Sequence, residues 1–357
     1  MDLNVYDTEL NMLGMVDEIT SLLWIRRYWN AGEFKLLLPY TERHVQLLEK
    51  NNLLMPHGGV YAGQIKYIHI AKDAFGMENL EIQGSLLEGW LGKRLVLSRI
   101  ATTASAYSIL NRIVTENLVN PANPDRKIAQ LSVLPNAGLT GEPLIEYISE
   151  PYATALKAGE TLAKAAALGF EIITDVRTKQ HGFKVYKGRD LTAGQTTNPP
   201  CIFSQDFDNV LEQEYTHGTE NLRTAAYVGG KEDNTGARTV VAVGGGAGLA
   251  RAEVFVNATD IDVALPDFQT LLANRGMDEL AGRTETLSFN SRINPHGHLQ
   301  YMEDYDVGDV VTCVDRRWGV RIDVRVTEVT EVFQKDSVDV EVTFGEALPT
   351  LMDKIGR

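Results

Sequence analysis

Alternating apolar and polar residues near the end of the chain predict antiparallel β-strands. In the segment Val320–Val326, aliphatic side chains occupy every second position and charged side chains lie between them. This pattern is typical of a strand with one buried and one solvated face. The apolar run Val310–Val314 comes before it, beyond a turn that contains Gly319, and the alternating run Ser337–Phe344 follows it. The sequence therefore predicts a three-stranded meander with no room for a crossover helix.

The alternation slips by one residue at Thr327–Glu328, so that Val329 falls at a position where the preceding pattern places a polar, outward-facing side chain. Because a slip of one would turn the following core side chains toward solvent, we expect a β-bulge or a bend at this point. Bends of this kind accompany curled sheets. The pattern therefore indicates a sheet that is closed, or nearly closed, into a barrel.

The first hundred residues show the same kind of pattern. The strands expected there are Leu22–Tyr28, Glu33–Leu38, Val60–Ala71 and Asn79–Gly84. The first two form a hairpin through Asn30–Gly32, and Phe34, Leu36 and Leu38 share one face. A short helix is expected over Thr41–Lys50, with Thr41 as its N-cap. This region is therefore mainly β.

A helical period replaces the alternation from about Thr102. The expected helices are Ala104–Leu118 and a region that begins near Pro143, is interrupted at Pro151, and continues over Ala153–Leu168 to a C-cap at Gly169. The runs Phe170–Thr174 and Phe183–Tyr186 are then expected to pair across Lys179–Gly182. This middle region is predicted to be α+β.

The β pattern returns near residue 200. The elements expected there are strands Asn209–Tyr215 and Thr224–Val228, a strand pair Thr239–Val243 and Ala252–Asn257, a helix Asp267–Ala281, a strand Thr286–Ile293 and a turn Asn294–Gly297. The chain thus divides into a first β domain (1–100), an α+β domain (101–200) and a second β domain (201–357) with a helix-containing insertion at about 231–283. The predicted fold class is mainly β with an α+β insertion.

Composition excludes several functional classes. The chain has 357 residues and a formal net charge of −14, from 48 acidic and 34 basic side chains. Nucleic-acid binding requires clustered Lys and Arg, so this balance disfavours it. No apolar run reaches the roughly 20 residues of a membrane helix, and the first residues do not form a signal peptide. We expect a chain made in a cytoplasm and not exported by that route.

Candidate metal and thiol sites are weak in this sequence. Cys201 and Cys313 lack a metal-ligand or disulfide spacing and are expected to be buried thiols. His296 and His298 could share a metal, but no third ligand lies nearby, so exposed turn histidines are the better interpretation. The remaining histidines are scattered. We therefore predict no metal site and no cofactor.

Candidate catalytic motifs are also weak. The glycine-rich run Val240–Ala250 lacks the spacing of a dinucleotide fingerprint and precedes a strand, so it is interpreted as a flexible hairpin loop. The acidic clusters Glu303–Asp306 and Glu212–Glu214 could supply a glycosidase pair, although a solvated acidic face explains them better. No nucleophile-elbow or zinc-protease motif occurs. We predict no catalytic residue.

Five motifs, in order across nearly the whole chain, resemble the siphophage and prophage tail-tip hub proteins. That family is related to the N-terminal domain of tail-associated lysins and to contractile-phage baseplate hubs. The motifs are Trp24–Pro39, Ile82–Leu87 with Arg94 behind it, Phe183–Asp190, Gly248–Val256 and Asp304–Val311. Each is a strand-and-turn pattern of low specificity, whereas the ordered set is specific.

The resemblance implies two tube-like β-barrel domains with an α+β domain between them. It further implies a homotrimeric ring at the tail tip of a virion, assembled in the host cytoplasm. Its expected partners are a distal tail or tail-tube protein above and a tip, spike or receptor-binding fibre protein below. Genome DNA would pass through the channel without specific binding, and part of the excess acidity is expected to line that channel.

Two other functions stay open from the sequence. A tail-associated enzyme that degrades the cell wall is suggested by the acidic clusters and the lysin relatives. Such lysins continue into a peptidase or glycan-cleaving region, however, and this sequence stops at Arg357. A host-glycan-binding tail module could use the tryptophans as stacking platforms, although their periodicity favours core packing. These residues are Trp24, Trp29, Trp90 and Trp318. A structural, non-enzymatic hub is the leading hypothesis.

Overall fold

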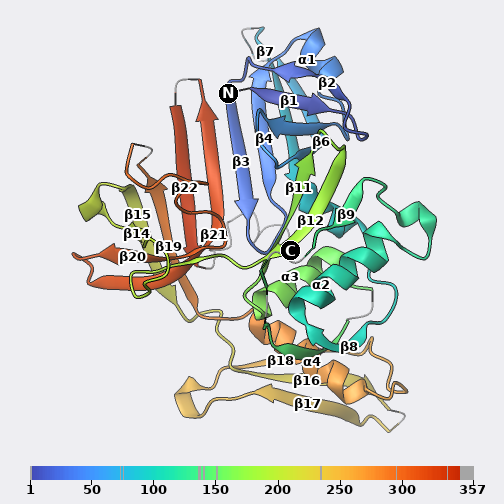
Figure 1. Ribbon diagram of the computed structural model, residues 1–357. Coiled ribbons are helices and arrows are strands. Elements are labelled where there is room, and N and C mark those ends of the chain that lie inside the picture. Colours follow the sequence, from blue (N-terminus) through green and yellow to red (C-terminus); the bar gives the residue numbers. More distant parts are fainter. Residues whose placement is uncertain are drawn as a thin grey trace.

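The computed structural model describes residues 2–345 except 73, 75, 136, 137, 140, 150, 151, 234, 295 and 336. Its main feature is a sheet of 14 strands that joins the two β regions (Figure 1). The strand order along the sheet is β15-β19-β22-β21-β3-β4-β7-β6-β5-β1-β2; off this path, β20 pairs with β21, and β13 and β14 pair with β20. The prediction of a mainly β protein is confirmed.

The first β region supplies one end of this sheet. Its elements are β1 (Leu3–Tyr6), β2 (Met12–Val16), β3 (Ser21–Arg27), β4 (Glu33–Pro39), α1 (Glu42–Leu47), β5 (Leu53–Pro56), β6 (Gly63–Lys72) and β7 (Glu78–Leu86). The predicted β3–β4 hairpin is confirmed, and Phe34, Leu36 and Leu38 are buried. The Thr41 hydroxyl caps α1 by accepting a hydrogen bond from the His44 N–H, also as predicted.

The second β region supplies the other end. Its strands in the large sheet are β13 (Asp190–Leu191), β14 (Ile202–Phe203), β15 (Val210–Gly218), β19 (Thr286–Ile293), β20 (Val310–Asp315), β21 (Val320–Gln334) and β22 (Ser337–Gly345). The register of β21 against β22 shifts between Val326 and Glu328. The predicted bulge is therefore confirmed, and it returns Val329 to the core face, where it is buried.

The long strand β21 connects the two β regions. Its first half pairs with β20, and its second half lies between β22 and β3. In Figure 1, β21 and β22 accordingly run beside β3 near the centre of the molecule. The pairings of the described strands form an open path, so the expectation of two closed tube-like barrels is not confirmed for this chain.

The middle region forms a compact α/β unit. Its elements are the 3₁₀-helix η1 (Leu87–Lys93), β8 (Ala101–Ser105), α2 (Ala106–Val114), the π-helical turn η2 (Thr115–Val119), the 3₁₀-helix η3 (Pro124–Arg126), β9 (Leu131–Val133), β10 (Leu144–Ile148), α3 (Ala155–Ala165), β11 (Gly169–Asp175) and β12 (Gln180–Tyr186). Helices α2 and α3 pack beside the β11–β12 hairpin (Figure 1).

Two predictions for this unit are wrong. Residues 144–148 form strand β10, which pairs with β8, whereas the sequence predicted a helix from Pro143. Helix α3 is capped at Ala166, and the left-handed residue is Ala167, so Gly169 begins β11 and is not the C-cap. The β11–β12 hairpin forms as predicted, but its turn ends at Lys179, so β12 begins at Gln180 and not after Gly182. Pro151 lies outside the described residues.

A separate three-stranded sheet packs against one helix at the bottom of Figure 1. It consists of β16 (Ala225–Glu232), β17 (Arg238–Gly244) and β18 (Glu253–Asn257), with the turn η5 (Gly248–Ala250) between β17 and β18, and α4 (Phe268–Ala281). The predicted pairing of the last two strands is wrong, because β16 lies between them, antiparallel to β17 and parallel to β18. The glycine-rich loop therefore crosses over β16 and is not a hairpin loop.

Candidate functional site

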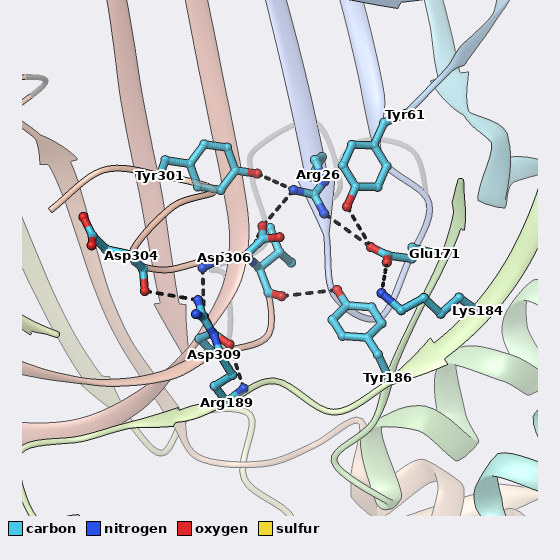
Figure 2. Close-up of polar contacts among 11 residues, drawn as sticks. Arg26, Tyr61, Glu171, Lys184, Tyr186, Arg189, Tyr301, Asp304, Asp306 and Asp309 are labelled. Carbon is cyan, nitrogen blue, oxygen red and sulfur yellow. Dashed lines mark hydrogen bonds and ion pairs between the residues drawn. The ribbon is translucent and has the colours of Figure 1, made fainter. Parts of the chain in front are cut away.

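The most constrained polar site is a buried charge cluster where the first β region, the α/β unit and the second β region meet (Figure 2). Arg26 lies on the inward face of β3 and is only 5% exposed. Its guanidinium forms ion pairs with Glu171 of β11 at 3.3 Å and with Asp306 at 2.8 Å. One side chain thus contacts carboxylates from two other regions. We call this set of residues the Arg26 junction.

Aromatic side chains complete the Arg26 junction. The guanidinium carbon lies 3.7 Å from the ring centroid of Tyr61, and a guanidinium N–H donates to the Tyr301 hydroxyl at 2.8 Å. The Tyr61 hydroxyl donates to Glu171, which also pairs with Lys184 at 2.8 Å. Burial alone would lower the pKa of Arg26, but the nearby Tyr301 and Asp306 outweigh it, and the pKa is raised.

A second ion pair fixes the loop that carries Asp306. The Asp309 carboxylate accepts hydrogen bonds from the backbone and the guanidinium of Arg189, and also from the backbone N–H of Asp306. Gly308, at φ +99°, places its backbone against the Tyr28 ring, where a Cβ atom would lie 2.4 Å from a ring carbon. These contacts give a structural reason for the motif Asp304–Val311.

This loop also corrects one sequence interpretation. Glu303, Glu212 and Glu214 are exposed, as a solvated acidic face requires. Asp306 is different, because its carboxylate is committed to Arg26. The burial of Arg26 could have been predicted from the sequence, because Arg26 alternates in step with Leu22 and Trp24 and so lies on the core face of β3. The sequence could not name its partners, because Glu171 and Asp306 are distant in the chain.

Two further carboxyl groups lie beside the Arg26 junction. Glu88 is 4% exposed and accepts a hydrogen bond from the Ile172 N–H, and burial raises its pKa to about 7. Glu331 follows Val329 on the inward face of β21, and burial likewise raises its pKa to about 7. Glu88 and Glu331 are therefore the groups beside the junction that we expect to titrate near neutral pH.

The titration of Glu88 predicts a stability profile opposite to that of most carboxylates. A pKa raised from 4.5 to about 7 means that the folded state binds the proton more tightly, so this stabilisation is complete below pH 4.5 and is lost as the pH rises through 7. We compare the free energies of unfolding of Glu88→Gln and the wild type at pH 5 and at pH 8. The difference should shift in favour of Glu88→Gln as the pH rises, by up to about 3 kcal/mol. Urea unfolding of both proteins at the two pH values measures the difference.

The exposed Glu49→Gln is the control for this experiment and should change the free energy of unfolding equally at both pH values. A Glu88→Gln variant whose stability relative to the wild type does not change with pH would show that Glu88 does not titrate in this range.

The outer face of the large sheet is the second candidate site. From β15 through β19, β22, the second half of β21, β3 and β4 to β7, the cross-strand pairs place seven acidic and three basic side chains on this face. These residues are Glu33, Glu81, Glu212, Glu214, Glu328, Asp339 and Glu341, and Arg27, Lys35 and Arg292. We call this surface the acidic sheet face.

The basic residues of the acidic sheet face are all neutralised by neighbours on the same face. Arg27 pairs with Glu33 and Glu328, Lys35 with Glu81, and Arg292 with Glu212. Among the described residues, no ion pair engages Glu214, Asp339 or Glu341. The uncompensated charge on this face is therefore negative, and it lies on β15 and β22 of the second β region, whereas the charges on β3, β4 and β7 are paired.

The two cysteines are buried, as predicted, and His296 and His298 are exposed turn residues. Cys201 and Cys313 are buried free thiols, and burial raises the pKa of Cys201 to about 11, which makes it a poor nucleophile. His296 and His298 are exposed, and no group of three His, Cys, Asp or Glu side chains in the described residues could hold a metal ion.

A buried Thr–His contact is the nearest approach to a nucleophile–base pair. Thr174 and His181 are cross-strand neighbours in the β11–β12 hairpin, and their side chains lie 3.0 Å apart. Both are almost fully buried, and burial lowers the pKa of His181 to about 4. The imidazole ring also lies edge-to-face with Trp90. Both residues also belong to the lining of a cavity of about 540 Å³.

The tryptophans are mostly core residues, as their periodicity predicted. Trp24 and Trp90 are buried and Trp29 is half-buried, whereas Trp318 is 48% exposed.

A cavity of about 540 Å³ opens between β1 and β5 on one side and β11 and β12 on the other, and its lining includes Asn4, Met55 and Ile173. No helix among the described residues is long and apolar enough to cross a membrane.

Comparisons with known proteins identify the fold. The tail protein of Neisseria meningitidis matches with a TM-score of 0.59 and 13% identity, over 96% of both chains. The 43 kDa tail protein of prophage MuSo2 from Shewanella oneidensis matches with a TM-score of 0.57 and 12% identity, over 96% of this chain and 98% of that one. Prophage tail protein gp18 from Listeria monocytogenes matches with a TM-score of 0.53 and 12% identity, over 100% and 98%.

Similarity at this level of identity establishes a shared fold. No curated protein matches the sequence. The family model described as siphovirus ReqiPepy6 Gp37-like protein matches residues 2–346, nearly the whole chain. The chain therefore belongs to the siphovirus ReqiPepy6 Gp37-like family.

Proposed function

We propose that this chain is a structural hub of the phage tail tip, three copies of which form a ring that closes the tail tube. The observation that carries the proposal is the acidic sheet face, a continuous sheet surface whose unpaired carboxylates, Glu214, Asp339 and Glu341, lie on β15 and β22. A channel that DNA must leave quickly should repel phosphates, and this face has the appropriate charge. We infer that it lines the channel.

The ring also gives the open sheet edges a partner. Among the described strands of the single chain, β15 and β2 end the strand path, so each pairs with a neighbouring strand on one side only. Closed rotational symmetry covers such edges without open-ended growth. In this proposal the chain consists of a first β domain (1–100), an α+β domain (101–200) and a second β domain (201–357) with its insertion at about 231–283. The two β domains complete their tube-like barrels only in the ring.

The proposed position in the virion defines the partners. A distal tail or tail-tube protein lies above the ring, a spike, tip or fibre protein lies below it, and genome DNA passes through without specific binding. The protein is assembled into the tail in the host cytoplasm. The charge clusters hold the fold together in this proposal, and the chain acts without catalysis.

Electron cryomicroscopy of the assembled tail tip tests the proposal. We expect three copies around a channel, with Glu214, Asp339 and Glu341 facing the lumen. A peripheral position or another copy number would refute the ring, and a channel lined by another surface would refute the assignment of the acidic sheet face.

A zymogram with host cell wall tests the non-enzymatic part separately. We expect no clearing by the purified protein. Clearing that is lost when Glu or Asp residues of a cleft are mutated would establish a wall-degrading enzyme instead.

A further inference from the structure

The β20–β21 turn carries a concentration of basic and aromatic side chains that is unusual in so acidic a protein. Arg316, Arg317 and Trp318 lie in the turn, and Arg321 follows on β21. Phe207, in the 3₁₀-helix η4 (Gln205–Phe207), is 47% exposed, and Trp318 is 48% exposed. We call these five residues the basic–aromatic patch.

Three residues of the basic–aromatic patch, Phe207, Arg316 and Arg321, line a small cavity. Its volume is about 190 Å³, and its lining combines the apolar side chains of Ile202, Phe207 and Val314 with Arg316 and Arg321. Sites for small molecules usually measure about 300–1,000 Å³, so this cavity is too small for most of them. It has room for one large apolar side chain, with guanidinium groups at its rim.

Three nearby carboxylates, those of Asp206, Asp315 and Asp323, balance the three arginines of the patch, and Asp206 also lines the cavity. Asp206 neutralises Arg316 at 3.3 Å, and the nearby Asp323 accepts a hydrogen bond from Thr312. Among the described residues, no ion pair engages Arg317 or Arg321. Trp and Arg are among the residue types that dominate the energy of protein interfaces, and the exposed Trp318 lies in the turn between Arg317 and Arg321.

We propose that the basic–aromatic patch docks a segment of a partner protein in which an apolar side chain is flanked by Asp or Glu. The apolar side chain fills the cavity between Ile202 and Val314, and the flanking carboxylates pair with Arg317 and Arg321. The apolar lining distinguishes this partner from a nucleic acid, whose phosphate backbone has no group for the cavity. The proposal does not depend on the number of copies in the ring.

Fluorescence anisotropy with short synthetic peptides tests the proposal on the full-length protein. The probe has a central Phe flanked on both sides by Glu, and matched peptides carry a central Ala or flanking Lys. We expect the probe to bind and the matched peptides to bind at least about fivefold more weakly. Arg321→Glu and Trp318→Ala should each weaken the binding of the probe by a similar factor.

The controls separate this docking site from general attraction between charges. Arg43→Glu changes an exposed arginine of α1, outside the patch, and should leave the affinity for the probe unchanged. All variants should keep the circular dichroism spectrum and melting temperature of the wild type, because the substituted side chains are exposed.

Three results would overturn the proposal. The first is equal binding of the Glu-flanked and Lys-flanked peptides. The second is equal competition by a single-stranded oligonucleotide of the same charge, which would identify a general polyanion surface. The third is an oligomer, detected by sedimentation velocity, that is lost in Arg321→Glu, because the patch would then be a contact between copies of this chain.

Discussion

Arg26→Met is expected to lower the free energy of unfolding by about 3–5 kcal/mol. The substitution retains much of the aliphatic volume but removes the ion pairs of Arg26 with Glu171, which is 7% exposed, and with Asp306. Lys184 still contacts Glu171, so we expect the greater loss at Asp306. Urea unfolding followed by circular dichroism measures the change.

The neighbouring Arg27 provides a matched control. Its side chain is 29% exposed and pairs with Glu33 and Glu328 on the outer face of the same strand. Because solvent screens such pairs, Arg27→Met should cost only about 1 kcal/mol or less. Asp306→Asn in the Arg26→Met background should recover part of the stability, since it removes the carboxylate that has lost its ion pair with Arg26. Equal losses for Arg26→Met and Arg27→Met would contradict the central role of the Arg26 junction.

The features that the sequence predicts correctly are those determined by local pattern. The β3–β4 hairpin follows from two alternating runs around a turn, and the bulge at Thr327–Glu328 follows from a change of parity. Both depend on which face each side chain must present to the core. That information lies within a few residues of the chain.

The features that the sequence misses depend on contacts between distant residues. Residues 144–148 form a strand because β8 offers a partner, whereas the sequence around Pro143 also fits the start of a helix. The insertion of β16 between β17 and β18 likewise depends on how the three strands and α4 assemble. The Arg26 junction joins three regions. The alternation of β3 places Arg26 on the buried face of the strand, but it gives no information about the distant carboxylates that pair with it.

The position of β21 strengthens the prediction for a truncated chain. A chain that ends at Val307 lacks β20, β21 and β22, and β21 is the only strand that pairs with β3 on the side away from β4 among the described strands. The truncation therefore removes the meander of the second β region and also exposes an edge of the first. We expect it to abolish cooperative folding of the second β region.

The expected loss exceeds the stability of an ordinary domain. The deleted strands supply buried core residues that include Val311, Val324, Val326, Val329, Val342 and Phe344. Each fully buried aliphatic or aromatic side chain contributes about 1.5–3 kcal/mol, whereas a whole domain is stable by only about 5–15 kcal/mol. A chain that ends at Gly345 keeps all three strands and serves as the matched control. Circular dichroism should show a cooperative unfolding transition for the control. Limited proteolysis should degrade residues 201–307 in the shorter chain. A short chain that is soluble, resists protease and unfolds cooperatively would refute the prediction.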